Sequence, residues 1–269
     1  MTDDFLARFG GIARLYGVTA LENFSKSHVM VIGLGGVGSW AVEALARSGI
    51  GHLSLVDMDD LCQTNINRQI HALTTTVGKS KSAVLAARCR EINPEIRITE
   101  HQSFYSERTS EEILFNEKPG VLIDAIDSKL QKCHLLATCR QHEVPVITSG
   151  SVGGRTDATQ VLIDDLSKTF RDPLLLSVRR SLRTHYGFPK TQNVTTKHKA
   201  PKFQIDAIFS SEQPFYSQCD GSTSIHRPKE LQGSIKCDSG FGAATHLTAT
   251  FGNLAAGWVL NHISKSKKY

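Results

Sequence analysis

The chain has 269 residues, of which 40% are hydrophobic and 21% are charged, and it carries a formal net charge of +5. These values are ordinary for a globular protein with one large domain, or one domain and a smaller appendage, and they permit an anionic partner without requiring one. The six cysteines form no C-x-x-C pair, which argues against a structural zinc site and a disulfide framework and fits a reducing cytoplasm. The acidic N-terminus shows no signal peptide.

The first part of the chain predicts a nucleotide-binding βαβ unit. After a helical lead-in over residues 1–27, an apolar run at 29–32 predicts a strand, and a glycine-rich string at 33–38 follows it directly. Helical spacing over 39–48 and a second apolar run at 53–56 complete the unit, which ends in Asp57. The glycines let the backbone approach phosphate, the helix start offers free N–H groups, and the acid accepts ribose hydroxyls. The unit therefore predicts a bound nucleotide without showing which one.

Strands and helices then alternate along the chain. After a polar loop insertion at 60–77 we expect, in order, a helix at 79–92, a strand at 96–98, a helix at 106–116, a strand at 121–124, a helix at 128–142 and a strand at 144–148. This alternation predicts an α/β fold with a doubly wound, mostly parallel Rossmann-like sheet. Residues 159–163 and 203–209 predict strands of an added antiparallel part.

Between these last two strands the chain is basic. Residues 173–205 contain no Asp or Glu and hold seven cations: Arg179, Arg180, Arg183, Lys190, Lys197, Lys199 and Lys202. Such a run is often only a solvated face, but seven cations without an acid favour contact with a phosphate backbone. We therefore expect a mobile basic arm that binds RNA.

Residues 239–260 lack Lys, Arg, Asp and Glu and are long enough to cross a bilayer. Their glycines and polar side chains dilute the hydrophobicity, so we expect a C-terminal helix buried against the sheet rather than a membrane span. We divide the chain into a nucleotide-binding part, residues 1–165, and a part with the arm, an antiparallel strand and the C-terminal helix, residues 166–269.

Several charged side chains follow the predicted strands. They are Asp57 and Asp59 after the second strand, Arg68 and Lys81 in the loop and helix that come next, and Asp127 after the strand at 121–124. Because the carboxyl ends of parallel strands face one crevice, these groups are expected to meet around one ligand. Two cations and an acid suit a triphosphate with Mg²⁺, whereas a surface ion pair is the plain alternative for any single cation.

Five motifs resemble, in order and spacing, those of the ThiF/MoeB family, the adenylating enzymes related to ubiquitin-activating enzyme. They are GLGGVGSWAVEALARSGIG, LVDMDDLCQTNINRQ, VGKSK, INPEI and LIDAIDS, and the resemblance covers about residues 8–165. It implies ATP-dependent adenylation of a carboxylate, with nucleotide contacts from Gly33, Gly35, Gly36, Asp57, Asp59, Asn65, Arg68, Gln69, Lys81 and Asp127. In this set the glycines line the phosphates, Asp57 takes the ribose, Arg68 and Lys81 act in catalysis, and Asp127 holds the metal.

Further motifs are similar to a branch of this family that acts on tRNA. These are RFGGIARLYG at 8–17, SGSVGG at 149–154 and CDSGFGAAT at 237–245. The resemblance implies that ATP drives cyclisation, with loss of water, of a threonylcarbamoyl group on the adenosine beside the anticodon, through an acyl-adenylate. It also implies a homodimer in which Arg8 or Arg14 reaches the partner's site, and a link to a cysteine desulfurase and its sulfur-acceptor protein. Cys237 is then either a sulfur-relay thiol or a buried structural cysteine.

Three alternatives stay open. The first is adenylation of a small sulfur-carrier protein, against which the missing C-x-x-C pairs count. The second is a nicotinamide dehydrogenase, supported by the glycine string and Asp57 alone. The third is a non-enzymatic RNA-binding protein, which leaves Arg68, Lys81 and Asp127 unexplained. No motif establishes a monovalent cation, although loop carbonyls are suitable ligands.

Overall fold

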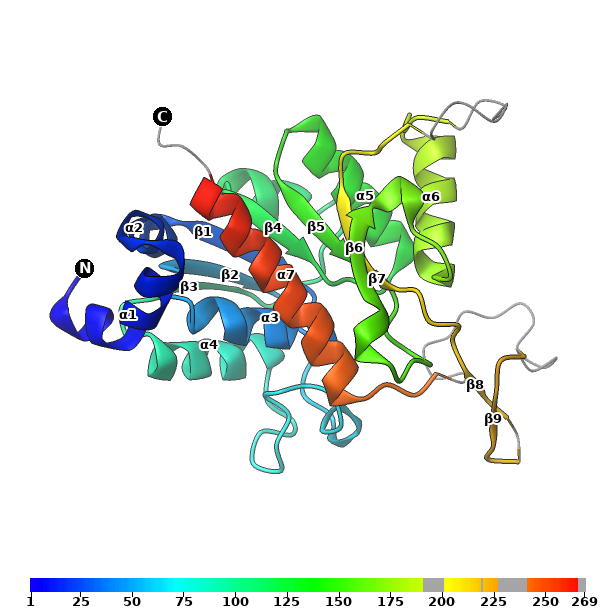
Figure 1. Cartoon of the computed structure of the whole chain (residues 1–269), viewed down its shortest axis with the longest axis horizontal. Helices are drawn as coiled ribbons and strands as arrows, with labels where there is room; N and C mark the ends of the chain where they lie inside the picture. Colours follow the sequence, from blue (N-terminus) through cyan, green and yellow to red (C-terminus); the bar gives the residue numbers. More distant parts are fainter. Residues whose placement is uncertain (191–200, 219, 227–240, 266–269) are drawn as a thin grey trace.

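The structure is a computed structural model that describes residues 1–190, 201–218, 220–226 and 241–265. Its centre is a seven-stranded sheet in the order β3-β2-β1-β4-β5-β7-β6 (Figure 1). The strands are β1 (His28–Ile32), β2 (His52–Val56), β3 (Arg97–His101), β4 (Val121–Asp124), β5 (Val146–Ser149), β6 (Val161–Asp165) and β7 (Asp206–Ser210). All neighbours pair in parallel except β6 and β7. The expected doubly wound, mostly parallel sheet is confirmed.

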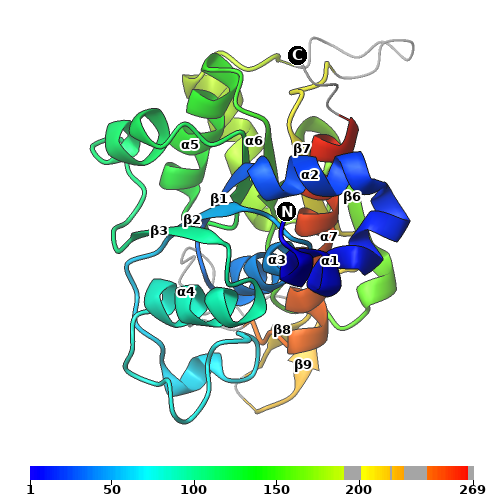
Figure 2. The ribbon, with the colours of Figure 1, turned by 90° about the vertical axis from the view of Figure 1, so that its left-hand side faces the viewer.

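Helices cover both faces of this sheet (Figures 1 and 2). One face carries α1 (Asp3–Tyr16), α2 (Val18–Lys26), α3 (Gly36–Ala46), α4 (Lys81–Ile92) and the long α7 (Thr245–Lys265). The other carries the π-helical segment η2 (Glu111–Asn116), α5 (Lys129–Gln141) and α6 (Pro173–His185). Alternate residues of one strand therefore enter different cores: Val29 and Val31 pack toward α3 and α7, and Met30 and Ile32 pack toward α5.

The C-terminal helix packs closely on the helix of the βαβ unit. A Cβ atom on Gly252 would lie 2.5 Å from the Val37 carbonyl oxygen and 2.7 Å from Trp40 Cβ, so only glycine permits this approach of α7 to α3. Residues 245–260 are thus a buried helix, as expected. Within the described ranges, no helix combines the length and apolar character needed to cross a membrane.

The segment expected to be a mobile arm begins instead with an ordered helix, α6. Asp172 caps it by accepting a hydrogen bond from Leu175 N, Pro173 occupies its first turn, and Leu175, Val178 and Leu182 form its buried face. The prediction of a mobile arm is wrong for residues 173–185, because it relied on the number of cations and overlooked the helical spacing of the apolar residues.

The other elements differ from expectation mainly at their ends. The helix expected at 106–116 is only η2, and the strand expected at 203–209 is β7, which starts at Asp206. Three short 3-10 turns lie at η1 (Gln63–Asn65), η3 (Ala158–Gln160) and η4 (Leu166–Lys168), and β8 (Tyr216–Ser217) and β9 (Thr223–Ser224) form a small antiparallel ribbon. β7 lies between β5 and β6, so the chain after residue 165 adds a strand to the same sheet.

Candidate nucleotide site

The glycine string forms a tight turn between β1 and α3. Gly33 has φ +89°, and a Cβ atom there would lie 2.7 Å from the Ala125 carbonyl oxygen in the loop after β4. A Cβ atom on Gly38 would lie 1.8 Å from the Gly33 carbonyl oxygen. Both positions therefore require glycine, and the start of α3, with its free N–H groups, points to the carboxyl edge of the sheet.

Asp57 lies at the end of β2 and holds this turn. Its carboxylate accepts hydrogen bonds from Leu34 N at 2.7 Å and from Asp59 N at 2.8 Å. Burial raises the pKa of Asp57, and the Lys81 charge and these two N–H groups oppose the rise. The predicted acid after the second strand is thus joined directly to the glycine turn.

Lys81, the first residue of α4, faces the same two carboxylates. Its Nζ lies 2.6 Å from Asp59 Oδ2 and 3.9 Å from Asp57 Oδ1. The Lys81 side chain is only 8% exposed, whereas that of Asp59 is 53% exposed. The structure thus brings Asp57, Asp59 and Lys81 together, although they come from two separate elements.

The loop between β2 and α4 supplies the remaining predicted contacts. Asn65 is buried, and its side-chain oxygen accepts a hydrogen bond from Cys62 N at 3.1 Å. Arg68 is half-buried, and its Cγ would lie 3.6 Å from a Cβ atom on Gly36. Gln69 is buried beside Gly35, and its Oε1 has no hydrogen-bond partner among the described residues. An unpaired buried acceptor beside the glycine turn is suited to a ligand that donates a hydrogen bond.

Helix α7 holds this loop in place, which the motifs did not predict. The Arg68 carbonyl oxygen accepts hydrogen bonds from Trp40 Nε1 and from Thr248 Oγ1, both at 3.1 Å. Thr245 Oγ1 donates to the Asn67 carbonyl oxygen at 2.7 Å. The start of α7 therefore positions the backbone on both sides of Arg68.

A buried ion pair underlies the end of β4. Lys132 Nζ of α5 lies 2.8 Å from Asp124 Oδ2, and Thr148 of β5 donates to the same oxygen at 2.7 Å, with Lys132 and Asp124 fully buried. Asp127 follows three residues later and is exposed at the carboxyl edge. Sequence reasoning missed Lys132, because a lysine in an amphipathic helix gives no signal that it is buried.

A second buried pair joins the end of β5 to α6. Asp172 accepts a hydrogen bond from Ser151 N at 2.8 Å, Arg155 lies 3.9 Å from it, and Arg155 Nη2 donates to the Arg171 carbonyl oxygen at 2.7 Å. A Cβ atom on Gly150 would lie 2.2 Å from Asp172 Oδ2. The motif at 149–154 therefore connects the carboxyl edge to the start of α6.

The predicted RNA-binding cations lie elsewhere. Arg179 is buried and donates a hydrogen bond to Thr169 Oγ1, so part of its guanidinium has a partner inside the protein, and its contact with phosphate stays a prediction. Arg180 is exposed, and Arg183 donates to the Pro189 carbonyl oxygen at 3.2 Å. Lys190 and Lys202 are exposed, and Lys197 and Lys199 lie outside the described residues.

These exposed cations are near the other edge of the sheet. Asp165, at the amino edge, accepts hydrogen bonds from Phe203 N at 3.0 Å and Gln204 N at 2.8 Å, next to Lys202. In Figure 1 the C-terminal end of α6 lies at the top, and the loop after β2 lies at the bottom. The predicted basic surface and the nucleotide site are therefore at opposite edges.

The remaining candidates are the cysteines and the N-terminal arginines. Cys237 lies outside the described residues, and of the described cysteines Cys62 is exposed and Cys89, Cys133 and Cys139 are buried. Arg8 is exposed in an ion pair of 2.7 Å with Asp4, and Arg14 is exposed in the last turn of α1.

A glycine turn after β1, an acid after β2 and a lysine and an arginine at one carboxyl edge define a nucleotide-binding α/β protein of the Rossmann type. The ThiF family matches residues 11–269, and the chain belongs to this family.

Two curated relatives match nearly the whole chain. The tRNA threonylcarbamoyladenosine dehydratase of Escherichia coli strain K12 is 44% identical over 261 residues, which are 97% of this chain and 94% of that protein. The tRNA threonylcarbamoyladenosine dehydratase of Haemophilus influenzae is 44% identical over 265 residues, which are 98% of this chain and 96% of that protein.

A solved structure matches the fold as well. The E. coli tRNA N6-threonylcarbamoyladenosine dehydratase TcdA in complex with ATP superposes with a TM-score of 0.83 at 41% identity, over 97% of this chain and 96% of that one. The similarity therefore includes the part after residue 165 and extends well beyond the βαβ unit.

Proposed function

We propose that this chain is an ATP-dependent dehydratase that cyclises threonylcarbamoyladenosine beside the anticodon of tRNA. The proposal rests on one observation at the glycine turn: Asp57 contacts Leu34 N and Lys81, and Lys81 also contacts Asp59. The chain that carries this site is similar over nearly its full length to dehydratases with this substrate in their names. A structure of one such relative contains ATP.

The chemistry begins with activation of the threonyl carboxylate. Its oxygen attacks the α-phosphorus of ATP, pyrophosphate leaves, and an acyl-adenylate forms. The neighbouring carbamoyl group then closes on the activated carbonyl carbon and AMP leaves, so that the nucleoside loses one water overall. The tethered carbamoyl group has a high effective concentration, which favours ring closure over hydrolysis.

Three side chains have distinct parts in this proposal. Lys81 and Arg68 offset the negative charge that builds up on the phosphates, and Asp57 accepts the ribose hydroxyls. Cys237 takes no part in the cyclisation itself, and a sulfur relay through it remains a separate proposal.

Mg²⁺ is the cation that this chemistry requires. Carboxylate oxygens are its preferred protein ligands, and Asp127 supplies one at the carboxyl edge. Asp127 would hold the ion, whose charge would offset the negative charge of the phosphates. Loop carbonyls at this edge are also suitable ligands for a monovalent cation.

The partners follow from the same proposal. The exposed cations Arg180, Lys190 and Lys202 and the half-buried Arg183 would contact phosphates of the tRNA stem from the amino edge. The active form would be a homodimer in which Arg8 or Arg14 enters the partner's site, and a cysteine desulfurase with its sulfur-acceptor protein would be an accessory. We place the protein in the cytoplasm, where its thiols remain reduced.

The decisive experiment is mass analysis of tRNA nucleosides. Purified protein incubated with ATP, Mg²⁺ and threonylcarbamoylated tRNA should release AMP and yield a nucleoside lighter by one water, and omission of ATP should abolish both products. Absence of the dehydrated nucleoside would reject the proposal. Pyrophosphate exchange that requires a small carrier protein instead of tRNA would support sulfur-carrier adenylation in its place.

A further inference from the structure

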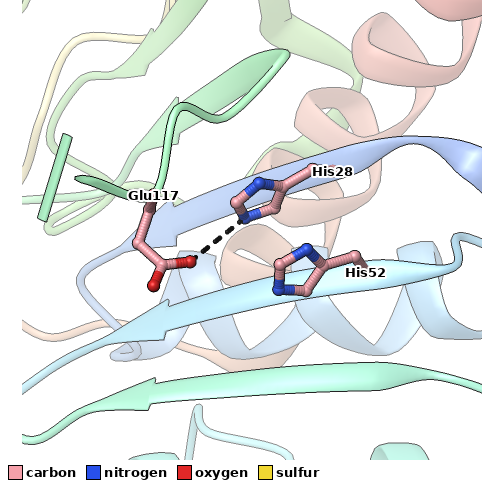
Figure 3. Close-up of side chains that lie close together, drawn as sticks. All are labelled: His28, His52 and Glu117. Carbon is pink, nitrogen blue, oxygen red and sulfur yellow. Dashed lines mark ion pairs between the residues drawn. The ribbon is translucent and has the colours of Figure 1, made fainter. Parts of the chain in front are cut away.

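A polar cluster lies on the face of β1, β2 and β3, under the end of η2 and outside the nucleotide site. His28 and His52 are directly paired residues of β1 and β2, and their rings stack with centroids 3.7 Å apart. Glu117, which follows η2, extends over them (Figure 3). Ser54 and His101 share this face because alternate residues of a strand point the same way.

The two histidine–Glu117 separations in this cluster are too long for direct hydrogen bonds. His28 Nε2 lies 3.9 Å from Glu117 Oε2, and His101 Nε2 lies 3.8 Å from the other oxygen, Glu117 Oε1. Both distances exceed hydrogen-bond length. They are close to the separation of about 3.4 Å between neighbouring ligands in a tetrahedral zinc site with Zn–N bonds of about 2.1 Å.

His101 is the second observation that points to a ligand. Its side chain is 10% exposed, and its Nε2, which faces Glu117, is buried with no hydrogen-bond partner in the described ranges. A buried ring nitrogen has lost its hydrogen bonds to water, and without a hydrogen-bond partner in the protein it is suited to bind a ligand. The ligand atoms of His28, His52 and Glu117 lie within 4.8 Å of one another.

We propose that His28, His52 and Glu117 bind one divalent transition-metal ion of the zinc type, with the unpaired His101 ring beside Glu117 at the edge of the site. Imidazole and carboxylate are ligands that select such ions over Mg²⁺ or Ca²⁺, and the two charges of the ion balance Glu117. The His28–Glu117 separation exceeds the tetrahedral value by less than 1 Å, and rotation of the stacked His28 and His52 rings would bring their nitrogens, which lie within 4.8 Å of each other, onto one ion.

Hydroxyl groups contact the two rings. Thr99 Oγ1 lies 2.9 Å from His52 Nε2, and Ser54 Oγ lies 2.7 Å from His28 Nε2 and donates a hydrogen bond to Glu117. An ion bound by these two nitrogens would replace their hydroxyl contacts and leave the Ser54–Glu117 hydrogen bond in place. Arg97 is the cation near this face, and its charge weakens the site without filling it.

The bound ion would join the end of η2 to the two strands β1 and β2. Metal that binds only the folded chain stabilises it by mass action, so the predicted effect includes a higher thermal unfolding midpoint. A C-x-x-C pattern does not reveal this site, because its ligands come from three separate segments and none is a cysteine.

The test uses the full chain after treatment with a chelator and without ATP or Mg²⁺. Titration with Zn²⁺ should show one tight equivalent and a raised unfolding midpoint, and Co²⁺ should give the visible absorption of a tetrahedral site. Glu117→Gln keeps the shape and the hydrogen bond from Ser54 but removes the charge, and it should weaken Zn²⁺ binding at least about tenfold.

The matched control is His185→Gln, which removes an exposed histidine outside the cluster. It should bind Zn²⁺ like the parent chain, whereas His52→Gln should behave like Glu117→Gln. Absence of a tight equivalent in the parent chain, or equal affinity in Glu117→Gln and the parent, would overturn the proposal and leave a hydrated polar cluster. The dehydratase assay is not part of this test, so either proposal can fail without the other.

Discussion

Lys81 Nζ lies 2.6 Å from Asp59 Oδ2, so the first residue of α4 is paired with the loop that follows β2. The two side chains differ in solvent exposure, since that of Lys81 is 8% exposed and that of Asp59 is 53% exposed. An arriving polyphosphate can therefore displace the Asp59 carboxylate toward solvent while the ammonium group stays in place. We infer that Asp59 holds Lys81 in position until phosphate replaces it.

Substitution of Lys81 tests this arrangement. Lys81→Met keeps the buried length of the side chain and removes the charge, so we expect kcat for AMP release to fall about 10²- to 10³-fold, the loss typical of one group that stabilises a transition state. The matched control is Lys79→Met, two residues earlier and exposed, which should retain the parent rate. Similar rates in the two variants would remove Lys81 from the mechanism.

The contact of α7 with α3 predicts opposite effects for two glycines of one helix. Gly252→Ala should lower the free energy of unfolding by about 1–3 kcal/mol, because the new Cβ would meet the Val37 carbonyl oxygen. At Gly257 no atom lies within 4 Å of the new Cβ, so Gly257→Ala should raise the free energy of unfolding by about 0.5–1 kcal/mol through helix propensity. Urea titration measures both, and equal effects would contradict the close packing.

The buried Asp124–Lys132 pair predicts a large loss of stability when one partner is removed. Lys132→Met leaves the Asp124 charge buried, which should cost about 3–5 kcal/mol of unfolding free energy. Lys168→Met, which breaks an exposed pair with Asp164, should change the unfolding midpoint little. A small effect of Lys132→Met would contradict the burial of an uncompensated charge at Asp124.

His71 predicts a pH dependence of stability. Burial lowers its pKa to about 3 in the folded chain, and in the part of the chain described here neither ring nitrogen has a hydrogen-bond partner. Between that value and the unfolded value of about 6.5, the unfolded chain binds more protons, so unfolding free energy falls as pH falls. From pH 7 to pH 5 this residue should account for about 2 kcal/mol of the loss.

Denaturation of His71→Leu across this pH range measures that contribution. The variant removes the titrating ring without breaking a hydrogen bond, so its curve should fall less steeply than that of the parent. The other histidine with a strongly lowered pKa, His28, is present in both chains and cancels in the comparison. Parallel curves would show that His71 titrates normally.

Sequence patterns were sufficient to predict the doubly wound sheet, the glycine turn and the meeting of Asp57, Asp59 and Lys81. Each depends on local periodicity, on chain order or on the rule that parallel strands end at one edge, all of which can be read along the chain. The motifs at 8–17 and 149–154 likewise indicate the related proteins from sequence alone.

Which side chains are buried depends on how the elements pack in space. Arg179 and Lys132 carry charges that predict exposure, yet both side chains are buried against partners on neighbouring elements. β7 lies between β5 and β6, and His28 lies near Glu117. Both arrangements join segments that are far apart in the sequence. Burial and strand order arise from non-local packing, which no window of sequence contains.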